Sequence, residues 1–407
     1  MRKSPTIPVL LLTGTLVAAG GAFAQTMDKN VKIGSLGDQS SLYSDIGGPG
    51  SVIAAQMAVE DSGLLQKGWK IEVIAADHQN KPDVASNIAR QWTDLEKVDA
   101  FIDMAASSVG LAASGIAREK NVVNLNTASA TSDLTNAQCS PNTVHWVYDT
   151  YMLANGTGTA LVKSGGDSWF FMTADYAFGH ALERDTGEVV KAAGGKVLGS
   201  VRHPLNSSDF SSFLLQAQAS KAKVIGLANA GGDTTNSIKQ AAEFGIVSGG
   251  QKLAGLLLFI TDVHALGLKT AHGLNFTETF YWDMNDQTRA FSKRFMERHK
   301  KSPPTMVHAG NYAAVLHYLK ALEALGGNPH DGRTVVAKMK EMPTDDPLFG
   351  KGSIQPNGRK IHPAYLFEVK KPEESKQPWD YYKLVATIPA EQAFMPLEKS
   401  TCPLLKK

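Results

Sequence analysis

The sequence predicts an α/β protein made of two doubly wound parallel-sheet lobes in series. Three observations lead to this prediction. The chain has 407 residues, more than one hydrophobic core usually organises, so two lobes are expected. Short β-rich runs alternate with longer helical patterns between residues 32 and 125, and the alternation starts again at residue 168. Such a rhythm places parallel strands in one sheet with helices on both faces.

The first series of elements follows from the spacing of apolar residues. In a helix expected over 51–62, Ile53, Ala54, Met57 and Ala58 recur at helical intervals. Residues 83–95 show the same period, and a third helix is expected around 111–119. The strands of this series are expected at 32–36, 70–75, 100–104 and 121–125.

The second series repeats the pattern and is followed by a mixed end. Its strands are expected at 168–172, 196–201, 224–227 and 253–259, and its helices at 178–193, 210–220 and 234–244. The remaining elements are expected to be strands at 273–277, 364–369 and 381–388, with helices at 288–299, 307–325 and 334–340. The repetition is therefore at the scale of a lobe, which is typical of doubly wound sheets.

The first residues indicate export. A basic start, Met1-Arg2-Lys3, precedes an apolar run over 9–19, and the small-residue sequence Ala22-Phe23-Ala24 follows. This order is that of a cleavable secretory signal, with cleavage expected near Ala24 and Gln25. The apolar run is too short to span a bilayer, which argues against the alternative of a retained anchor. We expect a periplasmic protein.

Charge and cysteine content narrow the function further. The 41 basic and 39 acidic residues give a net charge of +2 and are intermixed, so no nucleic-acid surface is expected. The chain has two cysteines, Cys139 and Cys402. In an oxidising compartment two distant thiols are best interpreted as one disulfide, and no nearby His or Cys cluster suggests a metal site.

Two loops at predicted strand ends carry small and hydroxylated residues. They are 105–111 (AASSVGL) and 126–131 (NTASAT), and each precedes a helix start. Because ligands of doubly wound sheets meet the carboxyl ends of the strands, exposed N–H groups and hydroxyls there would hold an anion without Lys or Arg. The alternative is simple helix capping by Ser108 or Ser129.

Signals of catalysis are weak. No Gly-x-Ser-x-Gly turn occurs, the histidines lack metal-ligand spacing, and residues 226–232 lack a Walker lysine or a dinucleotide fingerprint. No acid–base pair stands out. We therefore expect neither an enzyme nor a cofactor.

Several stretches in order resemble the type I solute-binding proteins of ABC transporters, the group that includes the leucine/isoleucine/valine-binding protein. They are 33–36 (IGSL) with 43–45 (YSD), 106–108 (ASS), 128–135 (ASATSDLT), 175–179 (DYAFG), 239–241 (KQA) and 244–245 (FG). The resemblance covers nearly the whole mature chain. It implies two lobes joined by three crossovers, with a ligand buried between them and the closed form recognised by a membrane permease.

Under this resemblance the chain divides into four parts. Residues 1–24 are the signal peptide, and 396–407 form a tail tied back by the disulfide. The first lobe is expected to comprise 25–147 with about 276–345, and the second 148–275 with about 346–395.

The resemblance also implies site residues. Tyr43 is expected in the cleft wall, and Ser107 or Ser108 with the N–H groups of Ala128 and Ser129 should hold a carboxylate. Thr131 is a further candidate, although the family hydroxyl aligns better with Ala130. The second lobe is expected to contribute Phe178, where the family often has a tyrosine. The remaining candidates near the cleft are Tyr151, Asn229, Ala230 and Asp233.

One departure bears on the ligand. Amino-acid binders of this group place an acid in the second lobe to pair the ligand's ammonium, but residues 256–261 (LLLFIT) contain none. Asp262 lies just beyond. Because an unpaired buried ammonium costs several kcal/mol, either Asp262 pairs it or the ligand has no ammonium. The apolar run and Phe178 favour an aromatic or other organic acid. A branched-chain or other amino acid, and a sensory ligand-binding module, are the alternatives.

Overall fold

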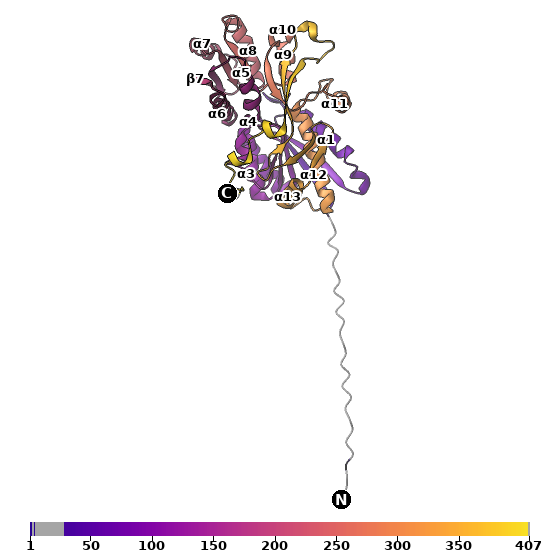
Figure 1. Ribbon diagram of the computed structural model, residues 1–407. Helices are drawn as coiled ribbons and strands as arrows, with labels where there is room; N and C mark the ends of the chain where they lie inside the picture. Colours follow the sequence, from indigo (N-terminus) through magenta and orange to yellow (C-terminus); the bar gives the residue numbers. More distant parts are fainter. Residues whose placement is uncertain (2–3, 5–27, 406–407) are drawn as a thin grey trace.

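The structure is a computed structural model that describes residues 28–405 together with Met1 and Ser4. The predicted signal peptide and its cleavage site thus lie, apart from those two residues, outside the described residues. Figure 1 shows two lobes, one with α1, α3, α12 and α13 and the other with α6 to α10. Among the described residues, no helix has the length and apolarity needed to cross a membrane.

The first lobe is built on a five-stranded parallel sheet in the order β2-β1-β3-β4-β5. Its strands are β1 (Asn30–Gly37), β2 (Lys70–Asp77), β3 (Ala100–Asp103), β4 (Val123–Asn126) and β5 (Thr143–His145). The helices of this lobe are α1 (Gly48–Asp61), α2 (Pro82–Gln91), α3 (Ser107–Lys120), α11 (Asp286–Arg298), α12 (Met306–Leu325) and α13 (Gly332–Glu341). Strands β3, β4 and β5 are buried along their whole length, whereas the edge strand β2 is partly exposed.

The second lobe repeats this architecture with a four-stranded parallel sheet in the order β7-β6-β8-β9. Its strands are β6 (Ser168–Ala174), β7 (Lys196–His203), β8 (Val224–Ala228) and β9 (Lys252–Gly255). Its helices are α4 (Thr150–Leu153), α5 (Thr159–Lys163), α6 (Ala177–Ala192), α7 (Ser211–Ala219), α8 (Gly232–Glu243), α9 (Ile260–Leu266) and α10 (Leu268–Ala271). The predicted α/β fold with two parallel sheets is confirmed.

The remaining strands form two small antiparallel sheets. One consists of β10 (Asn275–Glu278), β14 (Ala364–Val369) and β15 (Tyr382–Ile388), and its core side chains Phe276 and Phe367 pack with those of the second lobe. The other consists of β11 (Thr344–Asp346), β12 (Gly350–Ile354) and β13 (Lys360–Ile361), and lies beside β5 through a bridge between His145 and Arg359. The chain passes between the lobes after β5, β10 and β13.

Shorter elements complete the fold. They are 3₁₀ turns at Leu65–Lys67, Ser132–Thr135, Pro372–Glu374 and Leu397–Lys399, π-helical turns at Trp92–Glu96 and Ala154–Gly158, and α14 (Ala390–Ala393). The predicted lobe boundaries, at 147/148, 275/276 and 345/346, stay predictions, as does the tail from residue 396.

Three differences from the sequence predictions affect the site. Helix α3 begins at Ser107 instead of 111, because Ala106 adopts a φ of 67° and turns the chain directly into the helix. The strand predicted over 253–259 ends at Gly255, and Leu256–Phe259 form a buried connection to α9. A continuously apolar run shows neither the period of a strand nor that of a helix. Its sequence therefore does not distinguish a buried strand from such a connection. Strand β5 and the helical segment from α4 to α5 had no counterpart among the predicted elements.

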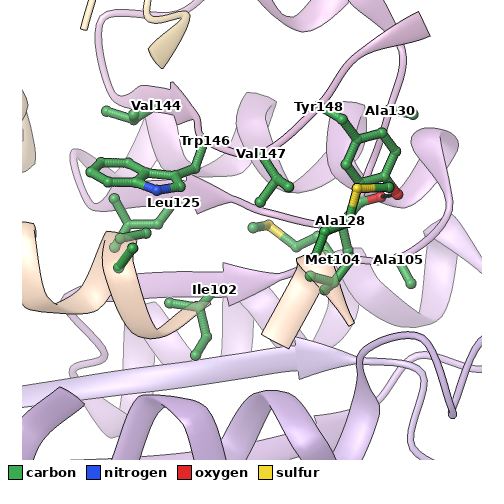
Figure 2. Packing of buried hydrophobic residues seen from close by; sticks show 14 of the residues in the cluster. Ile102, Met104, Ala105, Leu125, Ala128, Ala130, Val144, Trp146, Val147 and Tyr148 are labelled. Carbon is green, nitrogen blue, oxygen red and sulfur yellow. Dashed lines mark hydrogen bonds between the residues drawn. The ribbon is translucent and has the colours of Figure 1, made fainter. Parts of the chain in front are cut away.

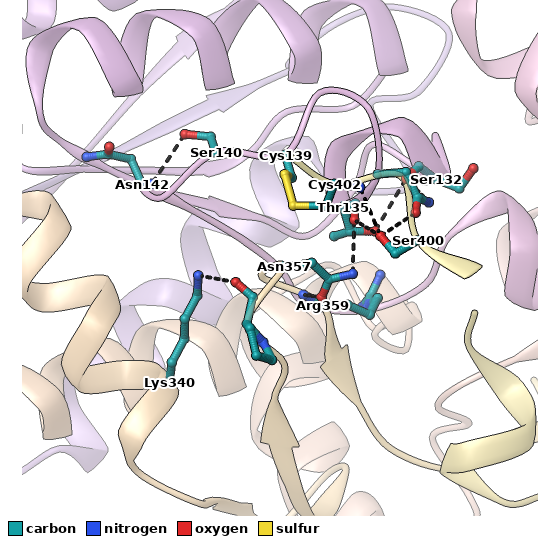
Figure 3. Close-up of a disulfide and its surroundings, with 12 residues drawn as sticks. Ser132, Thr135, Cys139, Ser140, Asn142, Lys340, Asn357, Arg359, Ser400 and Cys402 are labelled. Carbon is teal, nitrogen blue, oxygen red and sulfur yellow. Dashed lines mark hydrogen bonds between the residues drawn. A yellow bond between two sulfur atoms is a disulfide. The ribbon is translucent and has the colours of Figure 1, made fainter. Parts of the chain in front are cut away.

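Cys139 and Cys402 form a disulfide with Cα atoms 5.6 Å apart, which joins the C-terminal tail to the first lobe. Ser400 adds to this attachment, because its hydroxyl lies 3.2 Å from the carbonyl of Thr135 and 2.8 Å from the side-chain oxygen of Asn136 (Figure 3). The tail therefore lies against the segment that follows the small-residue loop at 126–131.

Candidate ligand-binding site

A narrow cavity of about 20 Å³ lies where the two lobes meet. This volume holds little more than one water molecule, so a ligand with a ring requires the lobes to move apart around it. The first lobe contributes loops that follow β1, β3 and β4, and the second lobe contributes loops that follow β6, β8 and β9. The lining residues are Tyr43, Ile46, Ala105, Ala106, Ser107, Ala128, Ala130, Tyr148, Tyr176, Phe178, Ala230, Leu257 and Phe259.

The start of α3 forms the polar end of this cavity. Ser107 and Ser108 occupy the first turn, where backbone N–H groups have no carbonyl four residues earlier to bond. The Ser107 hydroxyl oxygen accepts bonds from the N–H groups of Ala130, at 3.3 Å, and Thr131, at 3.0 Å. These bonds use the oxygen lone pairs, so the hydroxyl proton is left to donate to a further acceptor. The arrangement is suited to an anion.

A buried carboxylate fixes the loop that carries Tyr43. Asp38 is fully buried and accepts bonds from the N–H groups of Ser41 and Tyr43, both at 2.8 Å, and from the side-chain amide of Asn80 at 2.6 Å. The Tyr43 hydroxyl then lies 2.8 Å from that of Tyr176, which precedes α6 in the second lobe. The two lobes thus touch directly at the cavity wall.

Aromatic rings form much of the rest of the wall. Tyr148 and Phe259 meet edge to face with centroids 6.2 Å apart, and Tyr176 and Phe178 lie 5.9 Å apart. The Tyr148 hydroxyl donates to the carbonyl of Ala128 at 2.6 Å. Figure 2 shows Tyr148 close to Met104, Ala128 and Ala130. These contacts fix the ring as part of the cavity surface.

The lining is electrically neutral. Burial raises the pKa of Tyr43, Tyr148 and Tyr176 above the usual value for a phenol, so all three keep their protons at neutral pH. Within the part of the chain that the structure describes, none of the lining side chains carries a charge. Neutral hydroxyls and backbone N–H groups at the polar end would therefore have to hold an anionic ligand.

The structure brings five of the predicted site residues to this cavity, and the other seven lie elsewhere. The five are Tyr43, Ser107, Ala128, Phe178 and Ala230. Ser108, Ser129, Thr131, Tyr151, Asn229, Asp233 and Asp262 do not line it. Ligand contact by any of these residues stays a prediction.

The expected N–H donors of the loop after β4 are already engaged. The N–H of Ala128 donates to the Asp103 carbonyl at 3.1 Å, and that of Ser129 donates to the Asn126 side chain at 3.1 Å. The Ser129 hydroxyl bonds the carbonyls of Met104 and Ala106. Local bonds that shape the loop thus use both N–H groups in this structure, and their contact with a carboxylate stays a prediction.

Local bonds also occupy three other candidates. The Thr131 hydroxyl accepts from the N–H of Asp133 and so caps a 3₁₀ turn. Asn229 is fully buried and accepts from Thr234 at 2.7 Å. Tyr151 lines a separate surface groove between α4, α5 and β15. These three side chains support loops or lie outside the cavity.

Asp262 lies behind the cavity wall. It is 3% exposed and accepts the N–H of Phe259 at 2.9 Å as part of the cap of α9. Burial, with a smaller contribution from Asp45, raises its pKa to about 8. Asp233, the other acid near this edge, accepts the N–H groups of Asn206 and Ser207. Neither carboxylate lines the cavity.

Sequence reasoning missed eight lining residues: Ile46, Ala105, Ala106, Ala130, Tyr148, Tyr176, Leu257 and Phe259. The rule that ligands meet strand ends would have selected Tyr176, two residues after β6, and Leu257, two after β9. Tyr148 follows β5, a strand that was not among those predicted.

The model of the family described as "Periplasmic binding protein" matches residues 30–376. Among curated proteins, the chain is 24% identical over 372 residues to the Leu/Ile/Val-binding protein homolog 6 of Brucella abortus (strain 2308), covering 88% of this chain and 91% of that protein.

Solved structures extend the similarity to the fold. A periplasmic binding protein from Burkholderia mallei is 52% identical with a TM-score of 0.90, covering 93% of this chain and all of that one (100%). A branched chain amino acid ABC transporter periplasmic ligand-binding protein from Burkholderia xenovorans LB400 is 40% identical with a TM-score of 0.81, covering 92% and 99%. A solute binding protein from R. palustris in complex with benzoate shares the fold at 21% identity with a TM-score of 0.78, covering 92% and 99%.

Proposed function

This chain belongs to the periplasmic binding protein family, and we propose that it captures a small carboxylate with an apolar, aromatic body and delivers it to the permease of an ABC importer. The ligand would lie between the lobes, with its carboxylate at the start of α3 and its ring among Tyr148, Phe178 and Phe259. We also propose export to the periplasm, cleavage near Ala24 and Gln25, and no catalytic activity.

The observation that carries this proposal is the neutral lining of the cavity. An amino acid brings an ammonium as well as a carboxylate, and a buried ammonium needs an acidic or carbonyl partner. The candidate from the second lobe, Asp262, accepts the N–H of Phe259 and does not line the cavity. A ligand with one negative charge and an apolar remainder matches the hydroxyl and N–H groups at one end and the aromatic side chains elsewhere.

A branched-chain amino acid is the second candidate ligand. The names of the Brucella abortus relative and the Burkholderia xenovorans structure favour it, because both refer to branched-chain amino acids or to Leu/Ile/Val. In that case Asp262 would have to turn toward the cavity and exchange its bond with Phe259 for one with the ammonium.

A thermal-shift and calorimetry series with matched ligands separates the two candidates. Benzoate is compared with benzamide, which lacks the charge, and leucine with 4-methyl-2-oxopentanoate, which lacks the ammonium. A ligand at 100 times its Kd stabilises the folded state by about 2.7 kcal/mol, which is visible as a rise in melting temperature. We expect benzoate-like acids to bind while benzamide and leucine do not.

The Asp262→Asn variant provides the matched control for the site. It keeps an oxygen that can accept the Phe259 N–H but loses the charge. We expect its affinity for the aromatic acid to equal that of the wild type. Leucine binding that exceeds binding of the keto acid, and that disappears in Asp262→Asn, would replace our proposal with the amino-acid function.

A further inference from the structure

A groove away from the ligand cavity runs along the outer side of α11. Its floor contains Trp282 and Met296, and its sides carry Arg289, Lys293, Lys300 and Lys301 together with one acid, Glu297. An apolar floor surrounded by basic side chains is an unusual combination on a protein surface, and aromatic, Met and Arg residues are enriched in protein–protein interfaces.

One residue of the groove, Trp282, contacts the second lobe. The indole N–H of Trp282 donates to the carbonyl of Trp379 at 2.9 Å, in the connection that leads to β15. The Trp282 side chain also packs against two clusters of buried hydrophobic residues, the larger of which includes residues of both lobes. A rotation of one lobe against the other would therefore change the position of Trp282 relative to the rest of the groove.

Helix α11 is fixed to the first lobe. Arg294 forms two bonds with Asp61, both at 2.8 Å, and Arg298 forms two with Glu60, both at 2.9 Å, so two ion pairs bind α11 to α1. The lysines of α11 thus move with the first lobe, whereas the bond of Trp282 to Trp379 links it to the second.

The charge of the groove is largely uncompensated. Arg289 pairs with Asp283 and Asp286, at 3.0 and 2.7 Å. Within residues 28–405, by contrast, no carboxylate lies within 4.0 Å of the amines of Lys293, Lys300 and Lys301. Exposed amines of this kind attract an acidic partner and speed its association.

We propose that this groove docks an acidic segment of the membrane permease, with an apolar side chain of that segment resting on Trp282 and Met296. The assignment rests on the proposed function of the chain as part of an importer. The residues that line the groove all lie in the segment 282–301, and the bond of Trp282 to Trp379 connects one end of that segment to the second lobe, so closure of the lobes would shift Trp282 relative to the lysines.

Uptake of radiolabelled benzoate by host cells tests this proposal. Cells that lack the gene are complemented with the wild type or with the triple variant Lys293→Glu/Lys300→Glu/Lys301→Glu, and purified proteins are compared for ligand affinity. We expect uptake to fall by about tenfold or more while the Kd stays within about twofold of the wild type. The triple Lys→Arg variant should keep full uptake.

A second charge reversal controls for the loss of surface lysines in general. Lys191→Glu/Lys221→Glu/Lys239→Glu changes three exposed lysines of the second lobe and should leave uptake unchanged. Full uptake with the groove variant would overturn the assignment of the groove as a docking site and would leave the proposed function in place. Failure of the wild type to restore uptake would overturn the proposed function and the assignment together.

The test also separates a protein partner from a lipid surface. Purified protein is sedimented with phosphatidylglycerol vesicles at low salt. We expect no association. Vesicle binding that the groove reversal abolishes would assign the groove to an anionic membrane and overturn docking of a permease segment.

Discussion

The hydroxyl oxygens of Tyr43 and Tyr176 lie 2.8 Å apart, although the two side chains belong to opposite lobes. Tyr43 stands in the loop after β1, and Tyr176 immediately precedes α6. Both rings line the cavity, so the bond between them exists only while the lobes are together. This hydrogen bond therefore stabilises the closed form of the protein without any contribution from the ligand.

Removal of either hydroxyl should weaken ligand binding. A lost neutral hydrogen bond costs about 0.5–1.5 kcal/mol, so Tyr43→Phe and Tyr176→Phe should each raise the Kd by about two- to tenfold in calorimetry. The double variant should be no weaker than the single ones, because all three lack the same bond. Additive losses would show that each hydroxyl contacts the ligand separately.

Ser107 and Ser108 offer a matched pair. Ser107→Ala removes the acceptor of two N–H groups, those of Ala130 and Thr131. We expect a loss of about 1–3 kcal/mol in urea unfolding and a carboxylate Kd raised by about tenfold. Ser108→Ala should change both quantities little, since Ser108 does not line the cavity and alanine favours the helix. Equal effects of the two variants would contradict the assignment of Ser107 to the anion end.

The alternation of strands and helices sufficed to predict the two parallel sheets. It could not reveal β5, whose three residues, Thr143–His145, are too short for a period to be seen. Nor could it locate the end of β9, because Leu256–Phe259 are as apolar as the strand before them and are buried in the same way. A continuous apolar run indicates that a segment is buried, but it does not indicate the backbone conformation of that segment.

The position of the site could be predicted better than its individual contacts. The rule that ligands meet loops at strand ends led to Ser107 and Ala128, and both line the cavity, because the topology of the sheet decides where such loops meet. Asn229 also follows a strand, yet it accepts from Thr234 inside the lobe. A polar side chain can also turn inward and form a hydrogen bond with its own loop. Local geometry decides this, and a single sequence does not show that geometry.

The disulfide should stabilise the fold without affecting the ligand. Cys139 and Cys402 are 263 positions apart, and removal of a disulfide typically costs about 2–5 kcal/mol. The double variant Cys139→Ser/Cys402→Ser should therefore melt at a lower temperature and bind the ligand with the wild-type Kd. Reduced wild-type protein should behave in the same way. An unchanged melting temperature in both would indicate that the contacts of Ser400 alone hold the tail.

Asp262 should make stability fall as the pH rises. Burial and the nearby Asp45 raise its pKa from the usual 3.8 of an aspartate to about 8. Between these two values the native protein holds a proton that the unfolded chain has released. The native state then binds more protons than the unfolded state, so the free energy of unfolding decreases with pH over this interval and levels off above it.

The Asp262→Asn variant isolates this contribution. Asparagine keeps an acceptor for the Phe259 N–H and does not ionise, so the variant should gain stability relative to the wild type as the pH rises from 4 to 8. Burial raises the pKa of Glu278, and the charge of Asp262 raises it further, so the comparison reports the titration of Asp262 together with its coupling to Glu278. Urea unfolding at intervals across this range measures the difference. A stability difference that stays constant with pH would show that Asp262 is ionised in the native state, and hence available to pair an ammonium.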